Sequence, residues 1–430
     1  MDSRSPVFQL LKPRNLVALL AGLCTVLAVA THNPLMVMLS AASLATILVS
    51  GLRVWGLLEN VRVERDHHPR VFQGNSVAVS LRISGSERRT PELLLVEDSF
   101  PPSTTSRIRR LVEHPIGREF GVQFQYFGLC EHRRGLYILG PVRLQAADEL
   151  GFFQRELFME DFSELVIYPQ AVDLHQLDLL GAGTLAHVGL ETTRRTGASE
   201  EFLGVREYRP GDPISLVHWR STAHHDRLMV KEFQEEMTTV VTFFLDVGRL
   251  GLVGVGDQTS VEYGIKCCAS MAKRAVERGH QVGLFAVGAT VEHLPPGGGT
   301  AHLLALLDRL AFVKPMGDSG FAAVVRDLAK GLPRGSTAVL VMGATTIDFD
   351  ALAPGIALLI DRRILPVVVA IDDRAFIKIF QEQEERHYRA LPLEDIVNLL
   401  RLMGARVHVV RRAKSMGEAL VAGLEQEAVS

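Results

Sequence analysis

The chain has 430 residues, enough for two or three domains, and its content of 47% hydrophobic and 22% charged residues is typical of packed globular proteins. A formal net charge of -3 at pH 7 creates no general attraction for nucleic acid, so we expect no nucleic-acid partner. The four cysteines contain no Cys-x-x-Cys pair and therefore indicate neither a zinc site nor a disulfide framework.

A stretch without any Asp, Glu, Lys or Arg runs from Leu16 to Leu52. One helix of that length would reach about 55 Å, whereas the hydrocarbon layer of a membrane is ~30 Å thick. The turn formers from Thr31 to Pro34 interrupt the stretch, and a proline does not fit a helix interior. We therefore predict an N-terminal cytoplasmic tail over 1–15 and a transmembrane helical hairpin over 16–52.

Basic residues flank both ends of the apolar stretch. Lys12 and Arg14 precede it, and Arg53, Arg62 and Arg65 follow it. Because segments rich in Lys and Arg stay on the cytoplasmic side, we expect both ends in the cytoplasm. The expected location is the inner (plasma) membrane, with a multi-pass anchor, the lipid bilayer as a partner and the bulk of the chain cytoplasmic.

Two other interpretations of the apolar stretch are open. Small Ala28 and Ala30 could precede the cleavage point of a secretory signal peptide, in which case the second apolar run would stop in the membrane. The two segments could also be core helices of a soluble domain, although nothing nearby supplies the polar face that such a pair needs.

Residues 58–170 show apolar residues at every second position, for example in NSVAVSLRIS and GVQFQYFG, with Gly, Pro and Ser between the segments. This pattern predicts an antiparallel β-sandwich-like domain. Residues 171–236 begin irregularly, with GAGTLA and ETTRRTGAS, and are expected to form a connector that also carries a dense cluster of ionisable residues.

Residues 237–430 have a different pattern. Short apolar segments, including VVTFFLDVG, QVGLFAVG, TAVLVMGA and LPVVVAID, alternate with amphipathic helical segments. Apolar strands of this kind are buried on both faces in parallel sheets. We therefore predict a doubly wound α/β domain at the C-terminus.

Ligands of doubly wound sheets bind at the carboxyl ends of the strands, where Asp246 follows VVTFFL. This place is similar to that of the carboxylate with which von Willebrand factor A domains hold a divalent metal, in an Asp-x-Ser-x-Ser arrangement. Here Gly248 and Leu250 stand at the hydroxyl positions and Arg249 adds a positive charge, although Mg²⁺ requires nearly octahedral oxygen coordination. We expect a degenerate metal site, and neither a metal nor another cofactor.

Other candidates for chemistry are weaker. The 295–300 loop, PPGGGT, precedes a helical segment but lacks the Lys and the spacing of a P-loop, so a turn is expected. His218, His224 and His225 lack a further ligand at a suitable spacing. No Gly-x-Ser-x-Gly or Cys plus His signature supplies a nucleophile, and we expect no catalytic residue.

The stretch GVREYRPGDPISLVHWRSTAHHDRLMVKEF, residues 204–233, contains the dense ionisable cluster. Asp212 can accept hydrogen bonds from first-turn amides and Pro213 suits the first helical position, so we predict a helix from Pro213 to about Ala223. A strand, RLMVKEF, follows. The apolar stripe with which this helix is expected to pack on the α/β domain comprises Leu216, Trp219 and Ala223.

Two interpretations of the charged residues in this stretch are open, a partner-binding surface and a packed junction with ordinary solvated charges. The first assigns the residues to contact with another protein, and the second gives them no partner beyond water. The candidate partner-binding residues are Arg206, Tyr208, Arg209, Asp212, Trp219, Arg220 and Lys231.

The stretch resembles the signature of the bacterial domain-of-unknown-function family number 58, which runs roughly Arg-x-Tyr-x-x-Gly-Asp, then Ile or Val and Trp, then Ala-Arg, then Leu-Met-Val-Lys-x-Phe. A second block, residues 133–153, is similar to another part of the family. Ser215, Leu216 and His224 depart from the pattern at places where the family usually has Arg. The matching positions are Arg206, Tyr208, Gly211, Asp212, Val217, Trp219, Ala223, Leu228, Met229, Val230, Lys231 and Phe233.

The resemblance implies a membrane-anchored β-domain followed by a von Willebrand factor A-like domain, without established enzyme activity. Such proteins are often encoded beside a MoxR-type AAA+ ATPase. We expect a non-catalytic adaptor or scaffold that binds protein partners, such as that ATPase, in envelope-linked assembly or maturation. The alternative is a divalent-metal- or phosphate-dependent hydrolase with its site around Asp246 and the 295–300 loop, and a third, nucleic-acid binding through the Arg-rich stretch, is disfavoured by the acidic balance.

Overall fold

The architecture comes from a computed structural model of the chain. It describes residues 13–55, 58, 61–85, 93–113, 120–148, 150–174, 200–209, 214–225, 227–235, 239–248, 252–255, 258–317, 320–344, 347–373, 392–411, 418 and 421–422. The chain divides into two compact units, which are treated one at a time. Unit 1 comprises Met1–Gln170 with Leu307–Phe312, and unit 2 comprises Ala171–Leu306 with Val313–Ser430.

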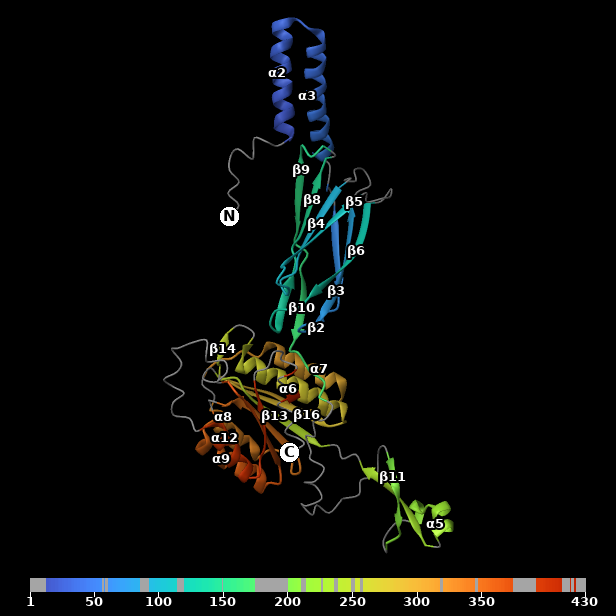
Figure 1. The fold of residues 1–430 in the computed structure, drawn as a ribbon, viewed down its shortest axis with the longest axis vertical. Helices are drawn as coiled ribbons and strands as arrows, with labels where there is room; N and C mark the ends of the chain where they lie inside the picture. Colours follow the sequence, from blue (N-terminus) through green and yellow to red (C-terminus); the bar gives the residue numbers. More distant parts are fainter. Residues whose placement is uncertain are drawn as a thin grey trace. The chain divides into compact units, whose positions relative to one another are not determined.

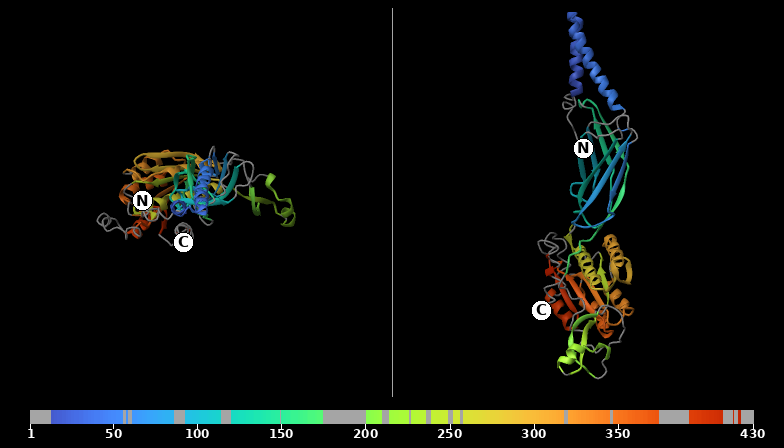
Figure 2. Two further views of the ribbon diagram at one scale, coloured as in Figure 1. Left: turned by 90° about the horizontal axis from the view of Figure 1, so that it is seen from above. Right: turned by 90° about the vertical axis from the view of Figure 1, so that its right-hand side faces the viewer.

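Unit 1 begins with two helices, α2 (Pro13–Thr31) and α3 (Pro34–Trp55), which lie next to each other in Figures 1 and 2. Each is long and apolar enough to cross a membrane. The break falls at the predicted place, where His32 has a positive φ of 45° and the Asn33 side chain accepts a hydrogen bond from Leu35 N–H. The predicted apolar helical hairpin is confirmed.

Small residues line the contact between α2 and α3. Ala21, Cys24, Ala28 and Ser40 are buried, whereas the leucine and valine side chains along both helices are mostly exposed. The hydroxyl groups of Ser40 and Thr25 lie 2.6 Å apart and link the two helices. Helices of a water-soluble protein bury their large apolar side chains, so this inverted distribution is typical of helices that face lipid.

The remainder of unit 1 consists of β-strands in three sheets, with the orders β1-β3-β6, β2-β10-β7 and β5-β4-β8-β9. Neighbouring described strands are antiparallel, except that β10 is parallel to β2. The strands are β1 (Arg62–His67), β2 (Arg70–Phe72), β3 (Ser76–Gly85), β4 (Leu93–Ser99), β5 (Arg107–Glu113), β6 (Phe120–Leu129), β7 (Gly135–Leu139), β8 (Val142–Ala147), β9 (Gln154–Met159) and β10 (Ser163–Tyr168).

The three sheets enclose one hydrophobic core, and we name this part of unit 1, residues 61–168, the β-domain. Alternate residues of β3 point inward, so that Leu81 and Ile83 are fully buried while the polar residues between them are not. Val54, near the end of α3, and Leu58 belong to the same core. The period-two pattern of the sequence therefore corresponds to strands with one face in a core.

Unit 2 contains a six-stranded sheet of order β17-β16-β13-β18-β19-β20. Five strands are parallel, and the edge strand β17 is antiparallel to β16. The chain builds outward in both directions from β13, so the predicted doubly wound α/β architecture is confirmed. The strands are β13 (Val240–Asp246), β16 (Gln281–Val287), β17 (Val291–Gly297), β18 (Thr337–Gly343), β19 (Leu365–Ile371) and β20 (Arg406–Val410).

Helices cover both faces of this sheet. On one face α6 packs so closely that a Cβ added at Gly264 would lie 3.3 Å from the side chains of Leu245 and Val341. Phe244, which points to the opposite face, joins a core formed with residues of α8, α9 and α12. The helices that follow in this part of the chain are α6 (Ser260–Glu277), α7 (Gly299–Phe312), whose last residues Leu307–Phe312 belong to unit 1, α8 (Phe321–Ala329), α9 (Phe349–Asp361) and α12 (Leu393–Leu402).

Candidate functional site

The charged stretch of the sequence folds as a β-hairpin, which we name the signature hairpin (residues 200–235). Its strands β11 (Glu200–Glu207) and β12 (Met229–Glu235) pair antiparallel in a sheet of two strands. The chain between them forms the 3-10 helix η1 (Ile214–Leu216) and the short helix α5 (Trp219–His225). Figure 1 shows α5 beside the two strands.

A few hydrogen bonds and two valines hold the signature hairpin together. His218 N–H donates to the Met229 carbonyl over 2.8 Å, and Met229 N–H donates to the Thr222 hydroxyl over 3.0 Å. Val217 forms an isolated antiparallel bridge with Val230. Among the hairpin residues whose side chains the structure describes, 205–209, 214–225 and 227–231, these two valines are the buried ones. The part of the hairpin whose side chains the structure describes therefore buries few residues.

The predicted helix from Pro213 to Ala223 is wrong in its extent. Ile214–Leu216 form a 3-10 turn, and α5 begins only at Trp219. The reason is a contact that is distant in sequence, because the bridge to Val230 takes Val217 out of helical geometry. Local capping signals in the sequence could not reveal this pairing.

The start of α5 and the direction of its tryptophan also differ from the prediction. His218 caps α5, since its Nδ1 accepts a hydrogen bond from Ser221 N–H over 3.2 Å. Asp212, the predicted cap, lies outside the described residues. Trp219, which we expected on a packed apolar stripe, is 66% exposed.

The outer surface of the signature hairpin combines apolar and basic side chains. Ile214 is 71% exposed, and Leu228 is exposed as well as Trp219. Arg209 and Arg220 are also exposed. Isolated exposed apolar residues are common, but tryptophan and arginine are the residues most enriched at the energetic centres of protein interfaces.

The other candidate partner-binding residues lie on the strands of the same hairpin. Arg206 and Tyr208 are half-buried at the end of β11, and the Arg206 guanidinium donates to the Glu207 carbonyl over 3.1 Å. Lys231 is half-buried on β12, opposite Val205. The structure thus brings six of the seven candidates onto one hairpin, and the seventh, Asp212, is the one outside its described residues.

Asp246 lies at the carboxyl end of β13, as predicted, and one of its carboxylate oxygens accepts a hydrogen bond from Gly248 N–H over 2.9 Å. The neighbouring loops are joined by backbone hydrogen bonds, with Met316 N–H donating to Val247 C=O over 3.2 Å. A Cβ added at Gly288 would lie 2.9 Å from the Met316 carbonyl oxygen. Backbone therefore packs tightly beside Asp246, and Leu250 lies outside the described residues.

The 295–300 loop is placed differently from the prediction. Pro295–Gly297 end the edge strand β17, and α7 begins at Gly299. Gly297 is required by packing, because a Cβ there would lie 2.5 Å from Nδ1 of the His302 ring. Pro295–Gly297 therefore belong to a strand that pairs with β16, and not to a turn that could bind phosphate.

The hydrolase alternative required Asp246 and the 295–300 loop to share one site, which the register contradicts. Asp246 is level with Val287 on β16, whereas Gly297 is level with Val282 on the same strand. Five residues of extended strand separate these levels, about 16 Å. The two features lie toward opposite ends of the sheet. In the described part of the chain no cluster of three His, Cys, Asp or Glu side chains could hold a metal ion.

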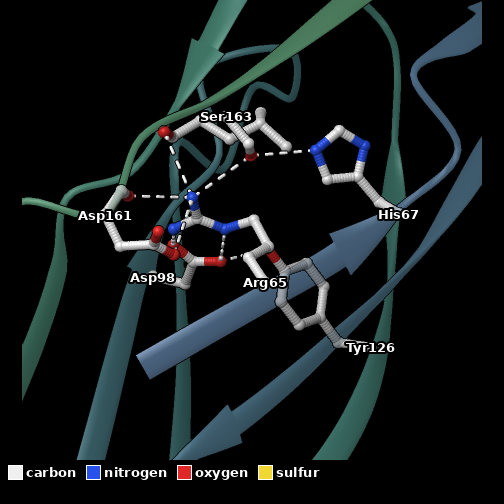
Figure 3. A network of polar contacts seen from close by, with 7 residues as sticks. Arg65, His67, Asp98, Tyr126, Asp161 and Ser163 are labelled. Atoms are coloured by element: carbon white, nitrogen blue, oxygen red, sulfur yellow. Dashed lines mark hydrogen bonds and ion pairs between the residues drawn. The ribbon is translucent and has the colours of Figure 1, made fainter. Parts of the chain in front are cut away.

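The β-domain contains a buried ionic network that the sequence interpretation missed (Figure 3). Arg65 on β1 forms a 2.7 Å salt bridge with Asp98 on β4, and the two side chains are only 1% and 2% exposed. The Tyr126 hydroxyl on β6 donates to the same carboxylate. Arg65, which we had counted among the basic residues flanking the membrane segment, is therefore an internal residue of the β-domain.

The same guanidinium reaches the third sheet. It donates to the Asp161 carbonyl over 2.9 Å and to the Ser163 hydroxyl over 3.2 Å. Ser163 in turn lies 2.8 Å from Nε2 of His67. Arg65 thus joins β1, β4 and β10, one strand from each sheet, and its role is to tie the sheets together.

Burial, followed by the negative charge of Asp98, raises the pKa of Tyr126 far above its ordinary value.

The signal for this network was present in the sequence. Leu94, Val96 and Asp98 share one face of β4 by their spacing of two, so the alternation places a carboxylate among core residues. A buried carboxylate requires a partner cation, and Arg65 stands at the inward position that follows Val63 on β1.

Comparison with known proteins identifies relatives of this chain without a described activity. Residues 204–374 match the family model "Protein of unknown function DUF58", and this region begins with the signature hairpin. The chain is 24% identical over 330 residues to the "Uncharacterized protein YeaD" of Bacillus subtilis (strain 168), covering 73% of this chain and 77% of that protein.

Solved structures add little to this comparison. Proximal thread matrix protein 1 from the mussel byssus has a TM-score of 0.24 and 10% identity, over 39% of this chain and 46% of that one. A β-glucosidase from Listeria innocua has a TM-score of 0.15 and 14% identity, over 26% of this chain and 16% of that one. Both matches span less than half of the solved chain, and their TM-scores are too low to support an argument. Residues 204–374 are thus the part of the chain that matches the family of unknown function DUF58.

Proposed function

We propose that this protein is a non-catalytic adaptor of the inner membrane that docks a protein partner on the signature hairpin. The helices α2 and α3 anchor the protein in the membrane, and the bulk of the chain is cytoplasmic. The partner that we propose is a MoxR-type AAA+ ATPase, in envelope-linked assembly or maturation. The choice of this ATPase rests on the family resemblance, whereas the choice of surface rests on the structure.

One observation carries the proposal of a docking surface. An isolated two-stranded hairpin is only marginally stable in water and needs a third layer against its apolar face. The described part of the signature hairpin buries only Val217 and Val230, and it exposes Trp219 and Ile214. A partner that covers these side chains would supply the missing layer, with Trp219 and Arg220 as its anchors.

The α/β domain supports a scaffold role rather than catalysis. Its strand order, with a single antiparallel edge strand, β17, resembles that of von Willebrand factor A domains, and we propose this fold for it. Gly248 offers no hydroxyl to a metal, and it uses its N–H to bind Asp246. A divalent cation at this position would have too few oxygen ligands from the β13 end.

Flanking charge supports the proposed orientation. Lys12 and Arg14 lie before the anchor, and Arg53 and Arg62 lie after it, so both ends of the hairpin carry the cytoplasmic signal. Protease added to sealed spheroplasts should leave the bulk of the protein intact, whereas inverted membrane vesicles should lose it. Digestion from the outside of spheroplasts would contradict the orientation.

Capture of the partner tests the docking surface. We would use the full-length protein in lipid nanodiscs as bait for a MoxR-type ATPase from the same organism. Replacing Trp219 by Ala and Arg220 by Glu should reduce capture at least about tenfold, because an anchor at the centre of an interface contributes more than about 1.4 kcal/mol.

Phe127→Ala provides the matched control, because Phe127 is an exposed aromatic residue on β6 of the β-domain. It should leave capture unchanged. Equal capture by the wild type and the double variant would refute the named surface. Loss of capture in the control alone would move the surface to the β-domain.

A further inference from the structure

The turn between β8 and β9 is built onto the helical anchor. Asp148, which follows the last residue of β8, is buried, and its carboxylate accepts hydrogen bonds from Phe153 N–H over 2.7 Å and Leu150 N–H over 3.3 Å. The hydroxyl of Ser50, within α3, donates to the same carboxylate. Every one of these contacts lies inside unit 1, and Figure 1 shows the ends of β8 and β9 at the base of the two helices.

A second set of contacts fixes the same turn to both helices. The Phe153 ring lies 3.5 Å from the position of a Cβ added at Gly51, and the Arg14 guanidinium of α2 lies 5.2 Å from the centre of this ring. Arg155, at the start of β9, donates to the carbonyl of Trp55 at the end of α3. The β8–β9 turn and the helix ends are therefore one packed structure.

These contacts determine how deep the turn reaches. Ser50 lies sixteen positions after Pro34, the first residue of α3. At ~1.5 Å per residue this distance is about 24 Å, which is less than the ~30 Å hydrocarbon layer that α3 would cross. A turn that contacts Ser50 and Gly51 must then lie at the boundary between hydrocarbon and lipid headgroups, deeper than Trp55 at the end of the helix.

The surface of the turn suits this boundary. Leu150 at its tip is 52% exposed, and Trp55 and Leu52 are exposed at the adjacent helix end. Arginine side chains stand at the same level, Arg53 exposed and Arg14 half-buried. Aromatic residues and arginines of this kind are enriched where a protein meets phospholipid headgroups. The carboxylate of Asp148, which would be unfavourable there, is already enclosed by its three donors.

We propose that the β8–β9 turn is a third membrane contact, which inserts Leu150 into the headgroup region of a phospholipid bilayer on the side where both helices end. The proposal rests on the proposed function only in requiring that α2 and α3 cross the membrane. Its consequence is that the β-domain is seated on the lipid surface and does not swing on a tether.

Single-cysteine fluorescence in nanodiscs tests this contact. We would label Leu150→Cys and Phe162→Cys with an environment-sensitive fluorophore and add lipids that carry a nitroxide at the headgroup. The two residues are matched, since Leu150 is 52% and Phe162 is 54% exposed, and Leu150 precedes β9 whereas Phe162 follows it. Leu23→Cys, on the exposed side of α2, reports insertion of the anchor when the nitroxide is deep in the acyl chain.

The native cysteines should not compete with the engineered cysteine for the fluorophore. Burial raises the pKa of Cys130 to about 11, and burial also raises the pKa of Cys267 and Cys268 well above its ordinary value. Cys24 is buried in the contact between the helices. An engineered, exposed cysteine reacts faster than any of these thiols.

The outcomes separate the two proposals. Quenching of the Leu150 label at least about twofold stronger than that of the Phe162 label, together with quenching at Leu23, supports the third contact. Quenching at Leu23 with equal, weak quenching at Leu150 and Phe162 overturns this inference and leaves the membrane anchor in place. Absence of quenching at Leu23 overturns the anchor and the inference with it.

Discussion

The β-domain and the signature hairpin are both built from antiparallel strands, but they differ in how they are stabilised. In the β-domain, large side chains such as Leu81, Leu94 and Leu144 are fully buried between three sheets. Each contributes about 1.5–3 kcal/mol through burial. The signature hairpin has two buried valines among its described residues. The first region is stable through its own core, whereas the described part of the second exposes apolar and basic side chains, which is why we propose it as a docking surface.

The placement of arginine shows the same difference. Arg65 is enclosed with Asp98 and joins three sheets, so its charge serves the fold. Arg220 is exposed on α5, where its charge serves no internal contact that the structure shows. The following experiments can break or sharpen this comparison, in order from the largest expected effect to the smallest.

Asp98→Asn should give the largest loss of stability. The substitution keeps the shape of the side chain but removes the buried counter-charge of the Arg65 guanidinium, which then has only the more exposed Asp161 carboxylate, 3.6 Å away. We expect the free energy of unfolding of the β-domain to fall by about 3–5 kcal/mol. Hydrogen exchange of the β4 and β6 amides measures this loss.

Glu64→Gln is the control for that experiment. Glu64 pairs with Arg82 on the surface, at 3.8 Å, and both side chains are well exposed. Such a pair contributes about 0–1 kcal/mol. Similar losses for the internal and the surface substitution would show that the buried network does not stabilise the fold in the way we describe.

Gly128→Ala should have the next largest effect. A Cβ at Gly128 would lie 2.4 Å from the ring of Phe100, which is fully buried. Overpacking of this kind costs about 1–3 kcal/mol in the free energy of unfolding. Gly121→Ala on the same strand meets nothing within 4 Å and should be tolerated in the same denaturation measurement. Equal stability of both variants would contradict the packing between Gly128 and Phe100.

Tyr126→Phe should change how stability depends on pH. The pKa of Tyr126 is raised in the folded protein by burial and by Asp98, so the folded state keeps the phenol proton when the unfolded state loses it. The stabilisation is therefore complete below the unfolded pKa of about 10 and declines above it, by up to about 1.4 kcal/mol per pH unit. Unfolding free energies on both sides of about pH 10 measure the decline. Parallel pH profiles of the variant and the wild type would disprove it.

Trp219→Ala should have the smallest effect on stability. Because Trp219 is 66% exposed, we expect the free energy of unfolding to change by less than about 0.5 kcal/mol. The wild-type tryptophan should also be quenched readily by iodide, in a variant whose other tryptophan, Trp55, is replaced by Phe. A loss of stability comparable with that of Asp98→Asn would mean that the signature hairpin is part of a core after all.

Local sequence patterns predicted the architecture well where burial alone decides it. The apolar segment of β13 and the helical segment of α6 follow from periodicity, because a strand buried on both faces admits few polar residues. Strand order does not follow from such patterns, since it depends on pairings between distant segments. The edge strand β17 was missed for a related reason, because Pro295 and the glycines after it favour a turn locally.

The candidate site was predictable only in part. The sequence motif led to the residues that share the signature hairpin, but the bridge between Val217 and Val230 shortened the helix and turned Trp219 outward. The Asp98 network was accessible from the alternation of β4, yet its partner Arg65 is 33 residues away in the chain. Contacts between distant residues, rather than local propensity, account for both differences.

The antiparallel edge strand β17 also affects how copies of this protein behave toward one another. It contains Pro295 and Pro296, which have no N–H to offer, and its side chains are mostly exposed. An open rim of a sheet otherwise invites a strand of a neighbouring molecule, and prolines are a common defence against such polymerisation. At high concentration, molecules of this protein should therefore not pair with one another through β17.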